Sequence, residues 1–384
     1  MTKTDLFGRP LGAAPEPTLS LTQKRQATML YHWMSQEYLE GLKAMIDALI
    51  DGVDVDLALA KVQGRDLVLA NDRWGVRDTA ANWSTHVYPA LDDFRQSTAW
   101  HRSARANQEY GMTGAYQCSR MISEHSSLWM SPEEEARFKS EFERVYRYAA
   151  RIDQVAGTGG ERPALNDRGM QRYWFDEGFD ALYPRLPRFR VRTDVVGESG
   201  KLPPRTGVYV PQTDPYGTLQ FGWTGNADGQ LGQVWTFSAA GLQAVAVLGR
   251  DALWHDGAAI AHYAAPRFAS GELEVPYGWE AEAAKDPLWA PTMLAQATRT
   301  QRPSKWYYVE RVEGEFDDSA AEPSAVEGNA ATLRCESGQP CPRAGFWFTP
   351  AREGSRRHFE HGEPMPDTGG DYGTTLWQWD DNQR

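Results

Sequence analysis

The chain has 384 residues, of which 41 % are hydrophobic and 24 % charged, and this composition excludes a wholly disordered chain and a collagen-like or coiled-coil rod. Its 40 Lys and Arg against 52 Asp and Glu give a formal net charge of −12, which disfavours nucleic-acid binding and favours a cationic partner. No run of about 18 apolar residues predicts a membrane span, and the first residues lack the apolar segment of a secretory signal. We therefore expect a cytoplasmic protein with no membrane partner, which agrees with the presence of only three cysteines.

Residues 18–156 are predicted to form an antiparallel helical bundle, and residues 1–17 an arm that precedes it. The letters S-L-T-Q from Ser20 match a capping box, and apolar residues then recur at helical spacing as far as Leu49. This pattern predicts one long amphipathic helix. A separate, shorter helix is expected to begin at Asp54.

Three further helices complete the predicted bundle. One surrounds Trp83 and bends near Pro89, and another runs from about Ser103 to Leu128. The third has the clearest start in the chain, with Ser131 as the N-cap, proline at the first helical position and acidic residues at the positive end of the helix dipole. We expect this helix to close the bundle.

The hydrophobic period changes after the bundle. Residues 157–200 are expected to be a loop-rich connector and residues 201–311 a mixed β/α domain. Residues 312–331, which include no Lys or Arg, should form a solvated acidic loop, and residues 332–384 a small β module packed on the preceding domain. The strands expected within the mixed domain and at its end are Thr206–Pro211, Thr218–Thr224, Val234–Phe237 and Trp306–Gly314. The expected helices are Ala239–Leu248 and Ala258–His262.

These elements together predict the α+β class. We expect an N-terminal antiparallel helical bundle, followed by a mixed, mainly antiparallel β region and a small C-terminal β module. No internal repeat of solenoid period interrupts this order.

Motifs for catalysis and cofactor binding are incomplete. The letters G-E-S-G-K from Gly197 do not make a phosphate-binding loop, because Val195 occupies the earlier glycine position and Leu202 follows the lysine. No nucleophile elbow is present, and Cys118 lies in a helical pattern typical of a buried, unreactive thiol. We therefore expect no catalytic residue and no cofactor, and hence no enzyme.

Four potential metal ligands fall in the C-terminal module: Cys335, Cys341, His358 and His361. The two cysteines are separated by five residues and the two histidines by two, and neither spacing is that of a zinc finger. Two interpretations stay open: a structural zinc site, and a metal-free module with two free thiols and two solvent-facing imidazoles. We assign no metal ligands.

Aromatic residues make up 12 % of the chain. Trp33, Trp83 and Trp129 lie in helical hydrophobic patterns and are expected in the core. Trp377 and Trp379 are two residues apart, so they share one face of a strand, where they either close the core of the module or form an exposed contact surface.

The second half of the chain resembles a known protein family. The resemblance rests on S-G-Q-P-C-P-R-A-G-F-W-F-T-P from Ser337, G-E-P-M-P from Gly362 and T-T-L-W-Q-W from Thr374, with Y-V-P-Q from Tyr209 and G-R-D-A-L-W from Gly249. In these respects the chain is similar to large immunity proteins of bacterial polymorphic-toxin and type VI secretion systems. Its glycines and prolines set turns and its tryptophans fill a core, so the motif marks a fold rather than a reaction.

The resemblance implies an immunity protein that binds a cognate secreted effector toxin and occludes its active site, without catalysis or cofactor. The negative charge suits an effector with a basic cleft, and we expect the acidic loop to contact it. The residues expected to do so are Glu313, Glu315, Asp317, Asp318 and Glu322. Two alternatives stay open: an enzyme that reverses the modification made by the toxin, and a carbohydrate-binding module suggested by the Trp content.

Overall fold

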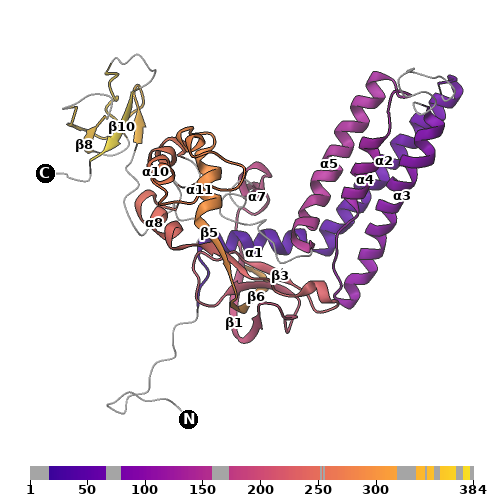
Figure 1. Ribbon diagram of the computed structural model, residues 1–384, viewed down its shortest axis with the longest axis horizontal. Helices are drawn as coiled ribbons and strands as arrows, with labels where there is room; N and C mark the ends of the chain where they lie inside the picture. Colours follow the sequence, from indigo (N-terminus) through magenta and orange to yellow (C-terminus); the bar gives the residue numbers. More distant parts are fainter. Residues whose placement is uncertain are drawn as a thin grey trace, which may run out of the picture. The chain divides into compact units, whose positions relative to one another are not determined.

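A computed structural model of the chain divides into two compact units, Met1–Ala320 and Ala321–Arg384 (Figure 1). Helices predominate in the N-terminal part and all strand pairs are antiparallel, which confirms the predicted α+β class. The residues that the structure describes are 17–65, 79–157, 173–250, 253, 256–317, 334–341, 344–349, 355–368 and 375–380. The predicted arm, apart from its last residue, lies outside them.

The helical part of the first unit begins with two helices where the sequence predicted one. Ser20 caps the first helix in a complete capping box. The helical conformation is then interrupted, and Ser35 caps a second helix, with its side chain accepting a hydrogen bond from the Tyr38 amide at 3.0 Å. Arg105, distant in sequence, donates to the Ser35 carbonyl and so fixes the break. The second helix then continues through Asp54, so the separate short helix predicted there is wrong. The helices of this part are α1 (Leu21–Trp33), α2 (Gln36–Val62), α3 (Ala80–Ala104), α4 (Ala115–Glu124) and α5 (Pro132–Ala156).

The helix predicted over residues 103–128 is also wrong, because α3 ends there and α4 begins only after Gly114. A 3-10 turn, Arg105–Asn107, leads to Gln108, whose φ of 59° is left-handed. The Asp153 carboxylate on α5 accepts hydrogen bonds from the amide and hydroxyl of Thr113, at 2.6 and 3.0 Å. These contacts hold the connection against α5.

The predicted cap of α5 is confirmed. The Ser131 side chain accepts from the Glu134 amide and the Glu134 carboxylate accepts from the Ser131 amide. Arg65, at the end of α2, pairs with the same carboxylate at 2.8 Å and fastens the two helices together.

A four-stranded sheet in the order β1-β6-β2-β3 and a two-stranded sheet of β4 and β5 follow. Two predictions are wrong here. The first strand occupies part of the expected loop-rich connector, and the sixth runs into the expected acidic loop at residues 312–316. Charged residues alternate along both strands and hide the apolar pattern, but they form ion pairs between strands, such as Arg192 with Glu310 at 3.2 Å. The strands are β1 (Pro187–Glu198), β2 (Gly207–Pro211), β3 (Gln220–Gly222), β4 (Val234–Phe237), β5 (Arg299–Arg302) and β6 (Lys305–Phe316).

Short helices surround the two-stranded sheet and share a second hydrophobic core with it. The predicted helix over Ala239–Leu248 is confirmed, and the one predicted at residues 258–262 is longer than expected. The helices of this core are α8 (Ala239–Leu248), α10 (Gly257–Ala269), η5 (Ala281–Lys285) and α11 (Ala290–Thr298). Two further segments lie outside it: α7 (Phe179–Leu182), whose Phe179 belongs to the main core, and η4 (Ala227–Gly229), between β3 and β4.

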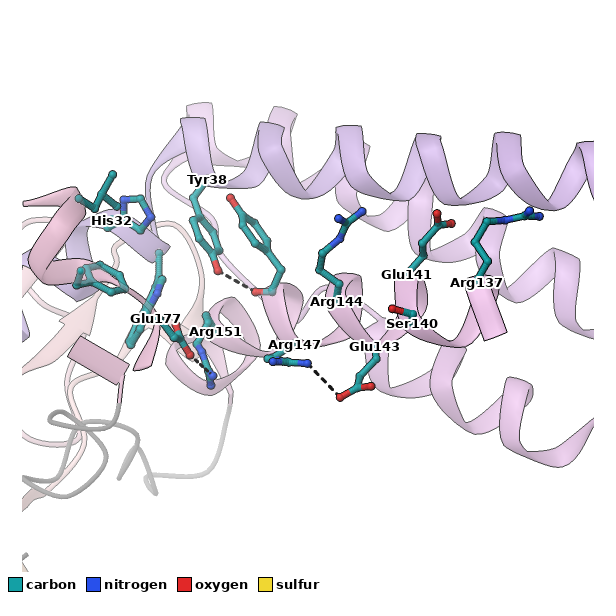
Figure 2. Close-up of a pocket in the computed structure, with 14 residues that line it drawn as sticks. His32, Tyr38, Arg137, Ser140, Glu141, Glu143, Arg144, Arg147, Arg151 and Glu177 are labelled. Atoms are coloured by element: carbon teal, nitrogen blue, oxygen red, sulfur yellow. Dashed lines mark hydrogen bonds and ion pairs between the residues drawn. The ribbon is translucent and has the colours of Figure 1, made fainter. Parts of the chain in front are cut away.

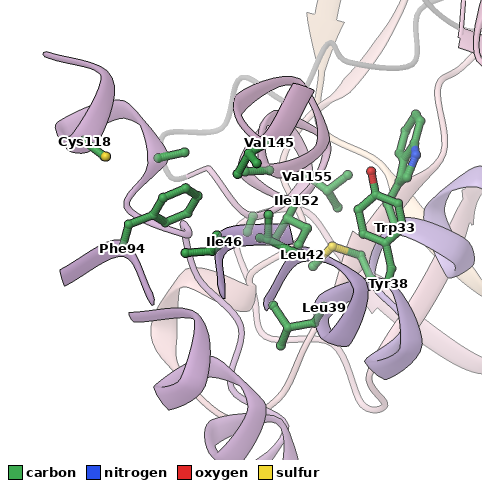
Figure 3. Packing of buried hydrophobic residues seen from close by; sticks show 14 of the residues in the cluster. Trp33, Tyr38, Leu39, Leu42, Ile46, Phe94, Cys118, Val145, Ile152 and Val155 are labelled. Carbon is green, nitrogen blue, oxygen red and sulfur yellow. The ribbon is translucent and has the colours of Figure 1, made fainter. Parts of the chain in front are cut away.

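The main core includes residues of the helices and of the larger sheet, so the predicted bundle and the start of the mixed domain are not separate. Figure 3 shows part of this core, with labelled residues from the helices. Trp33, Trp83 and Trp129 are buried in it, as predicted. Tyr31 on α1 donates a hydrogen bond to the Val309 carbonyl on β6, and the Phe221 ring of β3 belongs to the same cluster. The first helix thus joins the two parts of the unit.

The second unit is a small antiparallel sheet in the order β7-β10-β8-β9. Trp377 and Trp379 are buried, so they close the core, which was one of the two roles that the sequence left open. The Trp377 indole donates to the Pro366 carbonyl at 2.8 Å, and Trp379 lies edge-on to Trp347. The strands are β7 (Arg334–Glu336), β8 (Gly345–Phe348), β9 (Arg357–Phe359) and β10 (Leu376–Trp379).

Candidate functional site: an acidic aromatic surface

The residues predicted to contact a partner lie at the end of β6 and beyond it. Glu313 and Glu315 are exposed on the strand, and Asp317 follows it half-buried. Asp318 and Glu322 lie outside the described residues. The structure therefore places three of the five residues along one short segment at the end of β6.

Cations of this chain already face two of these three carboxylates. Glu315 pairs with Arg188 of β1 at 2.8 Å, and Asp317 pairs with Lys24 of α1. Within the described part of the chain, Glu313 has no such ion pair. Because paired charges cancel each other's field at a distance, the end of β6 offers a weaker attraction to a cationic partner than its sequence suggests.

A second acidic segment lies between α10 and α11, and the sequence reasoning missed it. We define the acidic aromatic patch as the exposed side chains of residues 272–289. Tyr277 is wholly exposed, Leu288 is 67 % exposed and Trp289 46 %. Trp279 packs against Trp289 with 5.6 Å between ring centroids, so three aromatic rings and a leucine meet solvent in one short segment.

A tight turn places Tyr277 at the tip of this segment. The Trp279 amide donates to the Pro276 carbonyl at 3.1 Å, which closes a four-residue turn, and Gly278 within it has a φ of 82° that favours glycine. The buried Leu273 anchors the preceding chain in the second core. The tyrosine is therefore presented to solvent by a fixed turn.

A second local motif positions the other end of the patch. The Asp286 carboxylate accepts from the Leu288 amide at 2.8 Å, and the Asp286 carbonyl accepts from the Trp289 amide at 3.0 Å. Ala284 and Ala290 on either side are buried. Leu288 and Trp289 are thus held outward between two buried anchors.

Carboxylates surround these apolar groups. Residues 272–289 contain five acidic residues and one lysine, a net charge of −4. Lys285 pairs with Glu282, and Arg267 of α10 pairs with Glu272 at 3.4 Å. The acidic residues are Glu272, Glu274, Glu280, Glu282 and Asp286, and all five are exposed.

The structure also places the cysteines and histidines that the sequence analysis considered. Cys118 is buried, as predicted, and its burial raises the pKa of the thiol to about 12, which disfavours the reactive thiolate. Cys335 and Cys341 are buried in the core of the second unit, whereas His358 is exposed on β9. In the part of the chain that the structure describes, no three His, Cys, Asp or Glu side chains are grouped so that they could hold a metal ion.

The acidic aromatic patch has the composition of a protein-binding surface. Aromatic anchors ringed by charged residues are typical of the sites that dominate protein–protein affinity. No helix among the described residues has the length and apolarity needed to cross a membrane. Neither a known family model, nor a curated protein, nor a solved structure matches the chain. Function is therefore inferred from this surface and from the sequence resemblance.

Proposed function

We propose that the chain is an immunity protein, which binds a cognate secreted effector toxin in the cytoplasm and neutralises it by occluding its active site. The observation that carries this proposal is the acidic aromatic patch. Apolar side chains that meet water at the tip of a fixed turn lose that exposure when a partner covers them, and this burial is the main source of affinity in such complexes.

The composition of the patch favours a partner with a basic cleft. Its net charge of −4 lies on a chain of −12, so both the local and the overall field attract a cationic surface. Enzymes that bind nucleic acids or nucleotides present such clefts to the phosphates of their substrates. An effector that is a nuclease or a nucleotide-using transferase would therefore meet Tyr277 and its acidic ring at its own substrate site.

The two kinds of residue have separate roles in this proposal. The exposed apolar side chains supply affinity, because they lose contact with water when the partner covers them. These are Tyr277, Leu288 and Trp289. The surrounding carboxylates accelerate the encounter and orient the partner, and salt screens that contribution. Inhibition by coverage needs no chemistry from this chain, and one molecule protects against one effector molecule.

Association kinetics with a candidate toxin domain, sought in the reading frames beside this one, test the proposal. Reversing Glu280 and Glu282 to Lys changes the patch by four charges, and we expect it to slow association about tenfold or more at low salt and to flatten the salt dependence. The control reverses Asp51 and Glu124, which are exposed on α2 and α4, and leaves the patch intact. Equal slowing by both variants would remove the patch from the interface.

A further inference from the structure

A second surface, unrelated to the acidic patch, has the features of a binding site for a small anion. A groove of about 760 Å³ runs between α2 and α5 and reaches α1 and α7 at one end (Figure 2). This volume is within the range of small-molecule sites. Its most prominent polar side chains are the arginines of α5.

Two glycines of α2 face side chains of α5 that line the groove. A Cβ atom at Gly41 would lie 2.7 Å from the hydroxyl oxygen of Tyr148, and Gly52 faces Glu141 of α5. Tyr38 of α2 and Tyr148 of α5 stack across the groove with 3.9 Å between ring centroids. Tyr38 therefore lines the α2 side of the groove, and the long side chains of α5 line the other side.

Arg144, Arg147 and Arg151 are spaced by three and four residues, so they follow one side of α5 over about 10 Å. Within the described residues no carboxylate pairs with Arg144. Arg147 pairs with Glu143 at 3.0 Å, but these side chains are 64 % and 73 % exposed, and such pairs are weak. Two neighbouring guanidinium groups can therefore turn to a ligand.

Arg151 closes the inner end of this row. Its side chain is only 10 % exposed, pairs with Glu177 and lies over the Tyr173 ring at 4.0 Å, so its orientation is fixed. Its Nε–H is buried and has no acceptor among the described residues. A buried donor without an acceptor destabilises the site, and a ligand oxygen beside it would remove that penalty.

The carboxylates of the groove restrict which anion fits. Glu141, Glu143 and Glu177 line it together with the arginines, so the groove does not attract a long acidic polymer by charge alone. Arg137, at the far end, is already held by Asp56. The remaining donors suit a compact oxyanion that accepts several guanidinium N–H bonds at once.

We propose that this groove binds a small phosphorylated molecule, with a phosphate group between Arg144 and Arg147 and a further oxygen of the ligand facing Arg151. Guanidinium groups match the oxygens of phosphate with paired hydrogen bonds. The Tyr38–Tyr148 pair also lines the groove, between the α5 positions of Arg147 and Arg151, so its rings can contact an organic group attached to the phosphate. The site does not depend on the proposed effector.

Isothermal titration calorimetry on the full chain at low salt tests the proposal with three probes: inorganic pyrophosphate, ADP and succinate. We expect pyrophosphate and ADP to bind more tightly than succinate, and Arg144→Ala to weaken both by about tenfold or more. Equal affinity for pyrophosphate and ADP would assign recognition to the phosphates alone, and tighter binding of ADP would add its organic group.

The matched control is Arg120→Ala, which removes an exposed arginine of α4 that pairs with Glu124 at 3.5 Å. Its affinities should equal those of the unmodified protein. Arg144→Lys should retain part of the affinity, since it keeps the charge but loses the paired hydrogen bonds. No binding of either phosphate ligand at millimolar concentration, or equal binding by Arg144→Ala and the unmodified protein, would overturn the proposal.

Discussion

Replacing Tyr277 by alanine separates a role in binding from a role in folding. The side chain is wholly exposed at the tip of its turn, so its removal takes no buried surface from the folded chain. We expect the free energy of unfolding to change by less than about 0.5 kcal/mol. Urea denaturation followed by tryptophan fluorescence measures this value.

The expected loss in effector binding is much larger. A tyrosine contributes roughly 150–250 Å² of surface, and at about 25 cal/mol per Å² its complete burial would contribute roughly 4–6 kcal/mol. Partial burial in an interface reduces this to about 2 kcal/mol or more, which corresponds to a Kd at least about 30-fold weaker. Calorimetric titration with the effector domain measures it.

The control for this experiment is Tyr116→Ala, because Tyr116 is also largely exposed but lies on α4 in the helical part. It should bind the effector as tightly as the unmodified protein. If Tyr277→Ala stayed folded and bound within twofold of the unmodified protein, the assignment of the patch as the anchor would be wrong.

Two further predictions concern stability. Burial raises the pKa of Asp153 to about 6 from an ordinary 3.8, so the folded state binds this proton more tightly than the unfolded state does. As the pH rises from about 4 to about 6, the free energy of unfolding should therefore fall by up to about 3 kcal/mol. Asp153→Asn should lose this dependence in urea denaturation; an unchanged pH profile would contradict it. Gly229→Ala would place a Cβ atom against the Trp223 carbonyl, and calorimetry should show a free energy of unfolding lower by about 3 kcal/mol or more. The loss should be smaller for Gly271→Ala, where the new side chain has open space and only the positive φ is strained. Equal melting temperatures for the two variants would refute this.

Local signals in the sequence predicted much of the fold. The cap at Ser131 needs only its neighbours within one turn, and the strand and helix over Val234–Phe237 and Ala239–Leu248 follow from short apolar patterns between turn residues. The break at Ser35 could not be predicted in this way, because Arg105 fixes it from a different helix. The first strand was missed because its arginines are matched by acids of β6, which follow more than a hundred residues later.

The binding surfaces were harder to predict than the elements. The density of acids around Tyr277 and Trp279 was visible in the sequence, but exposure of the aromatic rings depends on the turn at Gly278 and on buried anchors. The groove beside Arg144 is lined by residues of α1, α2, α5 and α7, which lie far apart in the chain and are brought together only by the fold. Composition predicted a cationic partner but not which part of the surface would contact it.

Inhibition stoichiometry tests the central claim most directly. If a reading frame beside this one encodes a toxin domain, its activity would be titrated with the purified protein at a concentration far above the Kd. We predict a linear fall to complete inhibition at an equimolar ratio, with Tyr277→Ala requiring a clear excess. Protection at a small fraction of an equivalent would indicate an enzyme that acts on the toxin or its product, and persistence of full effector activity at a large excess would show that the chain does not block it.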